Sequence, residues 1–441
     1  MTEATAGRSL ILSENKILRY ISFFILYFGQ GLPLGIATVA MPAWLAANGA
    51  PDADVAAIVA TAYLPWSFKW APAALMDRYS YLPMGRRRAW LILAFGLMLA
   101  GYAIAAFTAP GVGDIQVLVA ITFLLGAGSA IQDVAVDGLA VDILPEREQG
   151  PASSFMFGGQ ATGTAVSGAA AGFLLFAYGS QIAFLAYLPV IVLLMAYAII
   201  LRERPGEKRF PWSHGQTSQV NLDRHVGAWL PILAVTFKSL FKRDSLVYVA
   251  SAVGYRTAGG ILTPLFPILA TTMLLNPFNE ATYSATVSTV DLVVSLTAIA
   301  VGSFLTLRLG AKRSAMVSFA GLATVAAFIM LGREFWQITA VFLGMYAFYS
   351  LCTTLSSITT NPLRMQLSDP RVAATQFTIY NSISNLPVSL GATLFAVLGG
   401  TAALASVMTV AIGLFATSIV ILLFLRIGGR HVEVEPVPLV D

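Results

Sequence analysis

The sequence is poor in the residues on which soluble enzymes and metalloproteins depend. Only 11% of its 441 residues are charged, whereas soluble domains carry about 25%. A single cysteine, Cys352, excludes an intramolecular disulfide and a cysteine-rich metal centre. The three histidines, His214, His225 and His431, stand in polar segments, so a buried histidine cluster is not expected. Walker loops, zinc-ligand spacings and serine–histidine–aspartate sets are not found, and we expect no metal site, no organic cofactor and no enzymatic activity.

Apolar residues, by contrast, are abundant and continuous. They make up 57% of the chain, and the mean hydropathy is +0.76. A soluble core of this length could not bury so many, and a membrane-spanning helix needs about 20 mainly apolar residues. The stretches do not alternate, which excludes a transmembrane β-barrel. Twelve membrane helices are predicted, at residues 18–47, 54–76, 89–109, 114–143, 151–177, 181–201, 245–273, 281–307, 314–332, 337–363, 373–398 and 402–426.

The predicted helices fall into two halves that resemble each other. Gly85-Arg86-Arg87 follows the second helix, and Gly310-Ala311-Lys312-Arg313 follows the eighth, 225 residues later. Such a parallel repeat predicts an all-α membrane fold of two pseudo-symmetric six-helix bundles, as in major facilitator transporters. The predicted boundaries are a first bundle at 1–201, a cytoplasmic linker at 202–244, a second bundle at 245–427 and a cytoplasmic tail at 428–441.

The basic residues predict the orientation. The net charge of +4 comes from short Lys and Arg clusters between the apolar runs, not from one basic face, so no nucleic-acid partner is expected. With the N-terminus inside, these clusters fall in inside loops, whereas the outside loops carry Asp52, Asp54, Asp114 and Glu280, with Arg333 as their only basic residue. Both termini are therefore predicted to be cytoplasmic. Residues 1–16 are polar and the first apolar run is too long for a signal peptide, so we expect no cleavage.

Two acids inside the fourth predicted helix are candidates for chemistry. Asp133 and Asp137 stand four residues apart and share one face of the helix. A carboxylate within the hydrocarbon is costly and normally faces a cavity or a partner. Two such close carboxylates repel each other, so one can bind and release a proton near neutral pH. We expect both, with the neighbouring Gln132, to bind substrate or protons; fixed structural ion pairs are the alternative.

A lysine in the second predicted helix is a candidate partner for these acids. Lys69 stands between Trp66 and Trp70, at a height comparable to Asp133 and Asp137. A contact with one aspartate would neutralise it and leave the other free to titrate. The alternative is a lysine that snorkels past the two tryptophans to the inner membrane surface.

The second half carries its own intramembrane charges, Arg256 in the seventh predicted helix and Asp291 in the eighth. These two residues can pair with each other. Alternatively, Arg256 faces the central cavity and binds an anionic substrate group through forked hydrogen bonds. Uncharged polar residues within the helices are candidates for substrate contacts and, equally, for hydrogen bonds between helices. They are Gln30, Gln160, Asn361, Asn381 and Asn385.

The loop between the second and third predicted helices is a candidate gate. Its charged and glycine residues are Asp77, Arg78, Gly85, Arg86, Arg87 and Arg88. Asp77 can accept hydrogen bonds from a helix N-terminus or an arginine of a neighbouring helix. Such a contact would hold the two halves together on the inside while the outside is open. The alternative is an anchor that only sets the orientation.

Several of these segments resemble the AmpG muropeptide permease family. They are Gly31-Leu32-Pro33, Phe68-Lys69-Trp70-Ala71-Pro72, Met76-Asp77-Arg78-Tyr79, Gly85-Arg86-Arg87-Arg88-Ala89-Trp90, Asp142-Ile143-Leu144-Pro145 and Ala374-Thr375-Gln376-Phe377. The block from Gln132 to Gly138 is equally similar to the acetyl-CoA transporter family. Together these motifs are typical of the clade that contains both families.

The resemblance implies the twelve-helix major facilitator fold, a bacterial inner-membrane location and proton-coupled import of anhydromuropeptides for cell-wall recycling. It assigns proton coupling most directly to Asp133 and Asp137. The partners would be a small-molecule substrate and the lipid bilayer, around a functional monomer. One alternative changes the cargo to another anionic solute, such as an acyl-CoA or a nucleotide-linked compound held by Arg256. A more remote alternative is a non-transporting sensor or an intramembrane enzyme.

Overall fold

The fold is helical, as predicted. The computed structural model describes residues 10–222, 238, 240–368 and 373–426; of Ala74, Asp77, Glu146 and residues 373–375 it describes the backbone but not the side chain. Within these ranges, pairing of the strand type is limited to one isolated parallel bridge between Ile11 and Arg202. The predicted tail at 428–441, together with His225 and His431, lies outside the described residues.

Each predicted apolar run corresponds to one or more helices. The first half contains α1 (Lys16–Gly35), η1 (Ile36–Ala40), α2 (Met41–Ala47), α3 (Asp52–Tyr63), η2 (Pro65–Phe68), α4 (Trp70–Arg78), η3 (Leu82–Met84), α5 (Arg88–Thr108), α6 (Ile115–Ile143), α7 (Glu146–Leu185) and α8 (Tyr187–Ile200). The short α9 (Gln219–Leu222) follows. The second half contains α11 (Arg243–Ile268), η4 (Leu269–Met273), α12 (Glu280–Leu309), α13 (Ala311–Leu331), α14 (Arg333–Trp336), α15 (Thr339–Leu367), α16 (Ala373–Val397), η6 (Gly400–Ala403) and α17 (Leu404–Leu423).

Judged by length and composition alone, eight helical segments of the described chain could cross a membrane. One of them, Arg147–Ile200, contains two predicted spans, because the backbone of Gly179 (φ 77°) breaks α7 and reverses the chain. The spans that fall short are α3 to α4, α11 and α16. The span of α3 and α4 is divided by η2 into helices of 12 and 9 residues, with Lys69 directly before α4.

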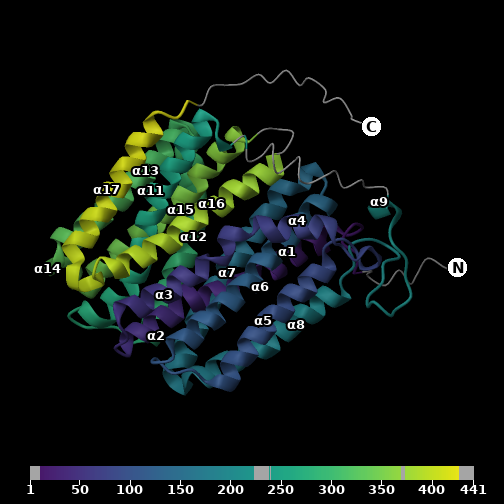
Figure 1. Cartoon of the computed structure of the whole chain (residues 1–441), viewed down its shortest axis with the longest axis horizontal. Coiled ribbons are helices and arrows are strands. Elements are labelled where there is room, and N and C mark those ends of the chain that lie inside the picture. Colours follow the sequence, from purple (N-terminus) through teal and green to yellow (C-terminus); the bar gives the residue numbers. More distant parts are fainter. Residues whose placement is uncertain (1–9, 223–237, 239, 369–372, 427–441) are drawn as a thin grey trace.

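Equivalent helices of the two halves make equivalent contacts. In the N-terminal half α1 packs along α7, and in the C-terminal half α11 packs along α16. Likewise α5 packs on α6 and α8, as α13 packs on α15 and α17. The halves meet where α7 contacts α12 and where α3 contacts α16, which are again corresponding pairs. The pseudo-symmetry predicted from the repeated loop motif is therefore present in the fold (Figure 1).

Glycines bring α1 and α7 unusually close together. A Cβ atom at Gly159 would overlap the carbonyl oxygen of Phe24, and one at Gly163 would overlap that of Phe28. A Cβ at Gly31 would likewise meet the backbone of Gln160. Small residues permit such close packing of membrane helices. The approach places polar side chains of α1 and α7 within reach of each other.

The two ends of the molecule differ in charge. We call the end with Arg86, Arg147 and Lys312 the basic end, and the end with Asp52 and Glu280 the acidic end. Figure 1 shows α4 and α9 toward the basic end and α2 and α14 toward the acidic end. Basic residues thus gather at the end opposite Asp52 and Glu280, as the positive-inside pattern predicts, with Arg333 of α14 as an exception at the acidic end.

Contacts between the halves lie at the acidic end and in the middle. Asp52 accepts hydrogen bonds from the backbone N–H and the hydroxyl of Thr401, both at 2.6 Å. Asn48 donates to Glu280 at 3.3 Å. Deeper in the molecule, Ser389 of α16 donates to the carbonyl oxygen of Ala60 at 2.7 Å. The halves are therefore joined on the acidic side of their interface.

Candidate functional site

The predicted acids and lysine meet inside the N-terminal half. Lys69 Nζ lies 2.9 Å from Asp133 Oδ2, and both side chains are buried. Gln30 Nε2 of α1 donates to the other oxygen, Asp133 Oδ1, at 2.5 Å. The bend between η2 and α4 positions Lys69, because the chain leaves regular α-helix over Pro65–Phe68. Asp133 is thus paired with Lys69, and in this structure the lysine does not snorkel to the surface.

A tyrosine of α1 joins the two aspartates. The Tyr27 hydroxyl donates to Asp137 through a short hydrogen bond and lies 3.4 Å from Asp133 Oδ1. Asp133 is only 5% exposed, whereas Asp137, one helical turn closer to the basic end, is exposed. One carboxylate is therefore held in a buried ion pair, whereas the other keeps accessible surface. The Tyr27 hydroxyl lies between them.

Three predicted glutamines surround this cluster. Gln160 of α7 donates to Gln30 Oε1 at 2.9 Å, so the network extends from α6 through α1 to α7. Gln132 instead donates to the carbonyl oxygen of Leu26 at 2.7 Å and is fully buried. Gln30 and Gln160 therefore belong to the aspartate network, and Gln132 fixes α6 against α1.

In the C-terminal half, Arg256 and Asp291 do not pair with each other. Asp291 accepts hydrogen bonds from Ser350 at 2.5 Å and Tyr346 at 2.9 Å, both on α15. Arg256 reaches Asn385 Oδ1 at 3.5 Å and lies over the ring of Tyr255. Of the two predicted arrangements, the Arg256–Asp291 ion pair is absent from the described residues.

A second arginine of this half is buried near the interface. Arg364 of α15 is 5% exposed and donates to the side-chain oxygens of Asn361 and Asn381 through short hydrogen bonds. Its guanidinium also lies over the ring of Phe377. The predicted polar residues Asn361, Asn381 and Asn385 thus bind Arg256 and Arg364.

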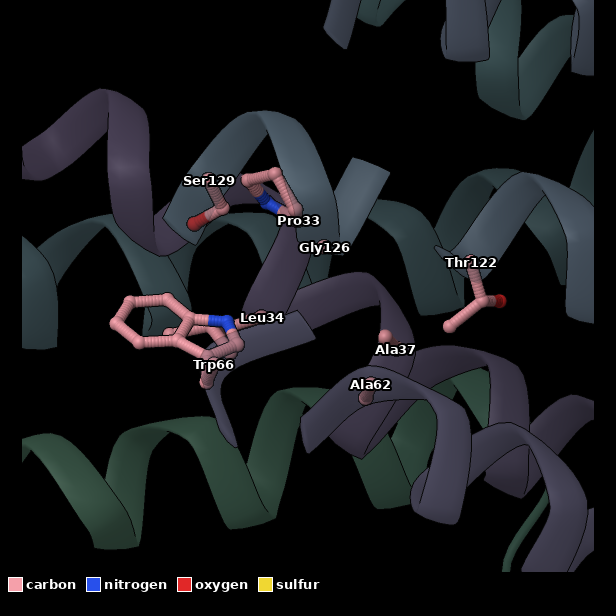
Figure 2. A pocket seen from close by; sticks show the side chains of 8 residues that line it. All are labelled: Pro33, Leu34, Ala37, Ala62, Trp66, Thr122, Gly126 and Ser129. Carbon is pink, nitrogen blue, oxygen red and sulfur yellow. The ribbon is translucent and has the colours of Figure 1, made fainter. Parts of the chain in front are cut away.

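A small pocket adjoins the aspartate network on its acidic side (Figure 2). Its lining residues are Pro33, Leu34, Ala37, Ala62, Trp66, Thr122, Gly126 and Ser129. Trp66 also packs against Lys69, whose Nζ lies 5.7 Å from the ring centre. The pocket lining is mainly apolar, and the space is only about as large as one water molecule.

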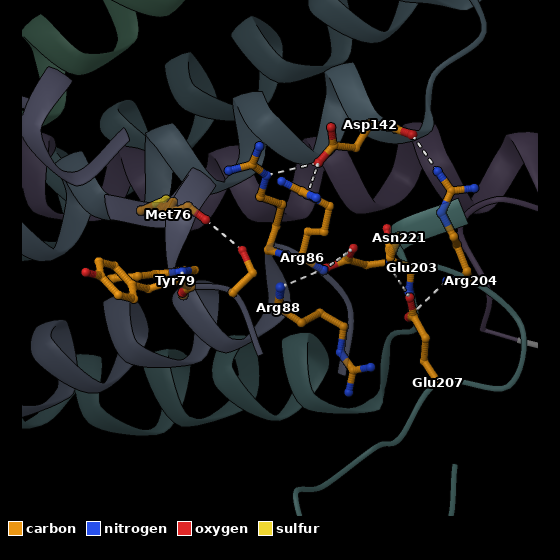
Figure 3. Close-up of polar contacts among 12 residues, drawn as sticks. Met76, Tyr79, Arg86, Arg88, Asp142, Glu203, Arg204, Glu207 and Asn221 are labelled. Atoms are coloured by element: carbon orange, nitrogen blue, oxygen red, sulfur yellow. Dashed lines mark hydrogen bonds and ion pairs between the residues drawn. The ribbon is translucent and has the colours of Figure 1, made fainter. Parts of the chain in front are cut away.

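At the basic end, the predicted gate residues are bound within the N-terminal half (Figure 3). The carboxylate of Glu203 accepts the backbone N–H groups of Arg86, Arg87 and Arg88 at 2.7 to 2.9 Å. This is the N-terminus of α5, where helix geometry favours an anion. Gly85 (φ 97°) sits against the same carboxylate, and a Cβ there would overlap it. Only glycine fits this backbone position.

The arginines of the gate continue the same cluster. Arg87 Nε lies 3.0 Å from Asp142 Oδ2 at the end of α6, and Arg86 Nε lies 4.0 Å from it. Arg88 donates to three backbone carbonyl oxygens, those of Ile199, Lys208 and Arg209. Arg78 is exposed, and the side chain of Asp77 is outside the described part. A latch between the halves at this loop stays a prediction.

Two acids of this cluster have raised pKa values. Burial raises the pKa of Glu203, although its three N–H partners oppose the shift. Burial and the neighbouring Glu203 raise the pKa of Glu207 to about 7. Glu207 Oε2 accepts the backbone N–H groups of Glu203 and Arg204, both at 3.0 Å. The first part of the predicted linker is therefore an ordered part of the N-terminal half.

Three residues of the site were missed by sequence reasoning. Tyr27 is one aromatic residue within an apolar run and carries no pattern of its own. Arg364 stands directly after the predicted span 337–363, so its position alone does not distinguish it from the arginines of the loops. Glu203 was assigned to the linker, although its position directly after the sixth apolar run is a usable signal.

The fold and the buried polar network define a membrane transporter of two pseudo-symmetric six-helix halves. The profile of the Major Facilitator Superfamily matches residues 21–392, which is most of the chain. The chain therefore belongs to the Major Facilitator Superfamily.

Relatives within this superfamily carry AmpG names. The Anhydromuropeptide permease of Escherichia coli K12 is 33% identical over 146 residues, which cover 33% of this chain and 29% of that protein. This alignment spans less than a third of the E. coli permease. A Rickettsia conorii protein named "Putative transporter AmpG 4" is 25% identical over 386 residues, covering 84% of this chain and 87% of that protein.

Solved structures share the fold at low sequence identity. The nucleoside transporter NupG has a TM-score of 0.67 and 12% identity, covering 92% of this chain and 97% of that one. A POT family transporter in complex with a thioalcohol conjugated peptide has a TM-score of 0.65 and 13% identity, covering 92% and 94%. At these identities the likeness supports the fold alone.

Proposed function

We propose that this chain is a proton-coupled permease that imports anhydromuropeptides across the bacterial inner membrane. The observation that supports this most is the Lys69–Asp133–Tyr27–Asp137 cluster, an ionisable network inside a helical bundle. Intramembrane acids of this kind are typical of proton pathways. The cargo is proposed from the AmpG names of the relatives.

In this proposal the exposed Asp137 exchanges protons with water, and the Tyr27 hydroxyl links its protonation state to Asp133. While Asp137 is charged, the Tyr27 hydroxyl donates to it. When Asp137 binds a proton, the hydroxyl is released to donate to Asp133, which lies 3.4 Å away. Protonation therefore weakens the hold of Asp133 on Lys69, because another donor now satisfies the same carboxylate. In this way the protonation state of Asp137 controls the strength of the Lys69–Asp133 ion pair.

Alternating access follows from the arrangement of the halves. The contacts at Asp52–Thr401 and Asn48–Glu280 close the acidic end, and the exposure of Asp137 gives access from the other side. With the basic end and both termini in the cytoplasm, this conformation faces inward. Rocking of the halves would open the acidic end and receive cargo and proton from outside.

The direct test is uptake of labelled anhydromuropeptide into proteoliposomes under an inward proton gradient. We expect uptake by the wild type, and loss of proton-driven uptake in Asp133→Asn and Asp137→Asn. Asp114→Asn, an exposed acid at the acidic end, is the matched control and should transport normally. Unchanged pH-dependent uptake in both aspartate variants would falsify their role in coupling, and no uptake by folded wild type would remove the muropeptide assignment.

A second cargo class has one observation in its favour. Arg256 is intramembrane and is not paired with Asp291, which suits an anionic solute such as an acyl-CoA or a nucleotide-linked compound. Thermal stabilisation by acetyl-CoA, compared with stabilisation by an anhydromuropeptide, separates the two cargo classes.

A further inference from the structure

The two intramembrane arginines of the C-terminal half bind only neutral side chains. Arg256 donates to Asn385, and Arg364 donates to Asn361 and Asn381. Among the described residues, neither guanidinium forms an ion pair with a carboxylate. Asp291, the partner that the sequence offers for Arg256, is held by Ser350 and Tyr346 instead. Two cations in this half therefore have no counter-ion of their own.

The asparagines place these two arginines along one face of α16. Asn381 and Asn385 are four residues apart on this helix, so they lie one turn apart on the same face. Asn385 also donates to the carbonyl oxygen of Trp66 in the other half at 3.5 Å, so this face of α16 lies at the interface. The arginine pair is thus on the interface side of the C-terminal half.

Both guanidinium groups keep an unused donor. The Nε atoms of Arg256 and Arg364 are buried and have no hydrogen-bond partner among the described residues. A buried charge normally requires an ionic partner, because its desolvation is costly. An asparagine oxygen is a weaker acceptor than an ionised oxygen, so an arriving oxyanion would displace it from the guanidinium.

We infer that Arg256 and Arg364 together form an oxyanion site that binds the charged group of the transported solute. The planar guanidinium fork matches a carboxylate or a phosphate. This inference rests on the proposed transport function and adds its ligand chemistry: a carboxylate in a peptide cargo, or a phosphate in an acyl-CoA cargo. The anion of the solute is then the counter-ion of Arg256 and Arg364, across the interface from the Lys69–Asp133 pair of the other half.

The test compares charged and neutralised ligands. Binding of an anhydromuropeptide and of its analogue with every carboxylate converted to an amide is measured by thermal shift, with acetyl-CoA as a third ligand. In the wild type we expect the charged muropeptide to bind about tenfold or more tightly than the amide, the effect of one charge-assisted hydrogen bond. In Arg364→Gln and Arg256→Gln this preference should nearly vanish while binding of the amide is unchanged. Arg308→Gln, an exposed arginine of α12, is the control.

The outcomes separate the site from the cargo. A full charge preference in both glutamine variants overturns the oxyanion site and leaves muropeptide transport standing. If acetyl-CoA is the only ligand that binds, and binds about tenfold more weakly to Arg364→Gln, this result supports the oxyanion site and contradicts the muropeptide as the cargo. If no ligand binds, the oxyanion site is tested by comparing the melting temperatures of the wild type and Arg364→Leu without ligand. Arg364→Leu should melt at the same or a higher temperature because a cation without a counter-ion is removed; a large fall contradicts the site.

Discussion

At the residue scale, the site separates two acids that the sequence makes look equivalent. Asp133 and Asp137 share a helix face, yet one is buried against Lys69 and the other is exposed. The difference comes from neighbours on other helices, Gln30 and Lys69, which reach only the deeper position. A buried ion pair beside an exposed acid gives the network one fixed and one exchangeable charge.

Tyr27 is the residue whose loss should reveal the link between these acids. Tyr27→Phe removes one hydroxyl that donates to Asp137 and reaches Asp133, while the ring still fills the same space. We expect proton-driven uptake to fall about tenfold or more, since a hydrogen bond to a charged group is lost. Tyr197→Phe, which removes a hydrogen bond to Ser22 elsewhere in the half, is the control. Equal uptake rates in the two variants would show that Tyr27 does not link the two acids.

Lys69 and Asp133 should behave as a coupled pair in stability measurements. Lys69→Met leaves a buried carboxylate without its cation, which costs about 3 kcal/mol or more. The double variant Lys69→Met/Asp133→Asn removes both charges and should recover most of the lost stability. Thermal unfolding in detergent of the single and double variants checks this; additive losses would argue against direct pairing.

The Lys69–Asp133 contact was predictable because both residues are rare intramembrane charges at matching heights of two parallel helices. Tyr27 and Arg364 were not, for physical reasons. The role of Tyr27 depends on how α1 is rotated about its axis relative to α6. This rotation cannot be predicted from a single sequence. Arg364 stands near a helix end, and its burial follows from the packing of α16, which brings Asn381 to it.

At the element scale, the helices themselves followed from the apolar runs, whereas their interruptions did not. The π-helical segments η1 and η4 stand at corresponding places in the first helix of each half. The change from α-helix to η2 at Pro65 positions Lys69. These changes from α-helix to π- or 3-10 helix depend on how the neighbouring helices pack against the backbone. The hydropathy of a segment does not predict them.

The close contact of α1 with α7 should be intolerant of even one added methyl group. In Gly163→Ala the new Cβ meets the carbonyl oxygen of Phe28, so the helices must move apart. We expect a loss of about 1–3 kcal/mol, typical of overpacking, and a lower uptake rate because Gln160 moves away from Gln30. Gly96→Ala in α5, where the space is open, is the matched control. Equal melting temperatures for the two variants would contradict the close contact.

The segment after α8 should make stability depend on pH. The pKa of Glu207 is raised from 4.5 to about 7, so the folded chain retains its proton where the unfolded chain has lost it. Stability should therefore fall as pH rises from about 4.5 to 7 and level off above. Glu207→Gln should flatten this slope, and the exposed acid variant Glu334→Gln should keep it. Melting temperatures between pH 5 and 8 provide the measurement, and an unchanged slope in Glu207→Gln contradicts the assignment.

At the scale of the whole molecule, transport requires that the two halves separate at the acidic end. Asp52 and Thr401 come from opposite halves and touch in the present conformation. A cross-link formed by Asp52→Cys and Thr401→Cys, made in a Cys352→Ala background, should block uptake, and reduction should restore it. The single-cysteine variants under the same oxidation are the control. Full uptake by the cross-linked protein would show that this end does not open.

The central claim is that proton and solute cross the membrane together through the Asp137 cluster. Its most direct measurement uses proteoliposomes with a trapped pH-sensitive dye and no imposed gradient, to which an anhydromuropeptide is added outside. The wild type should acidify the lumen as solute enters, and Asp137→Asn should not. Entry of the solute into wild-type vesicles without any acidification would contradict proton coupling.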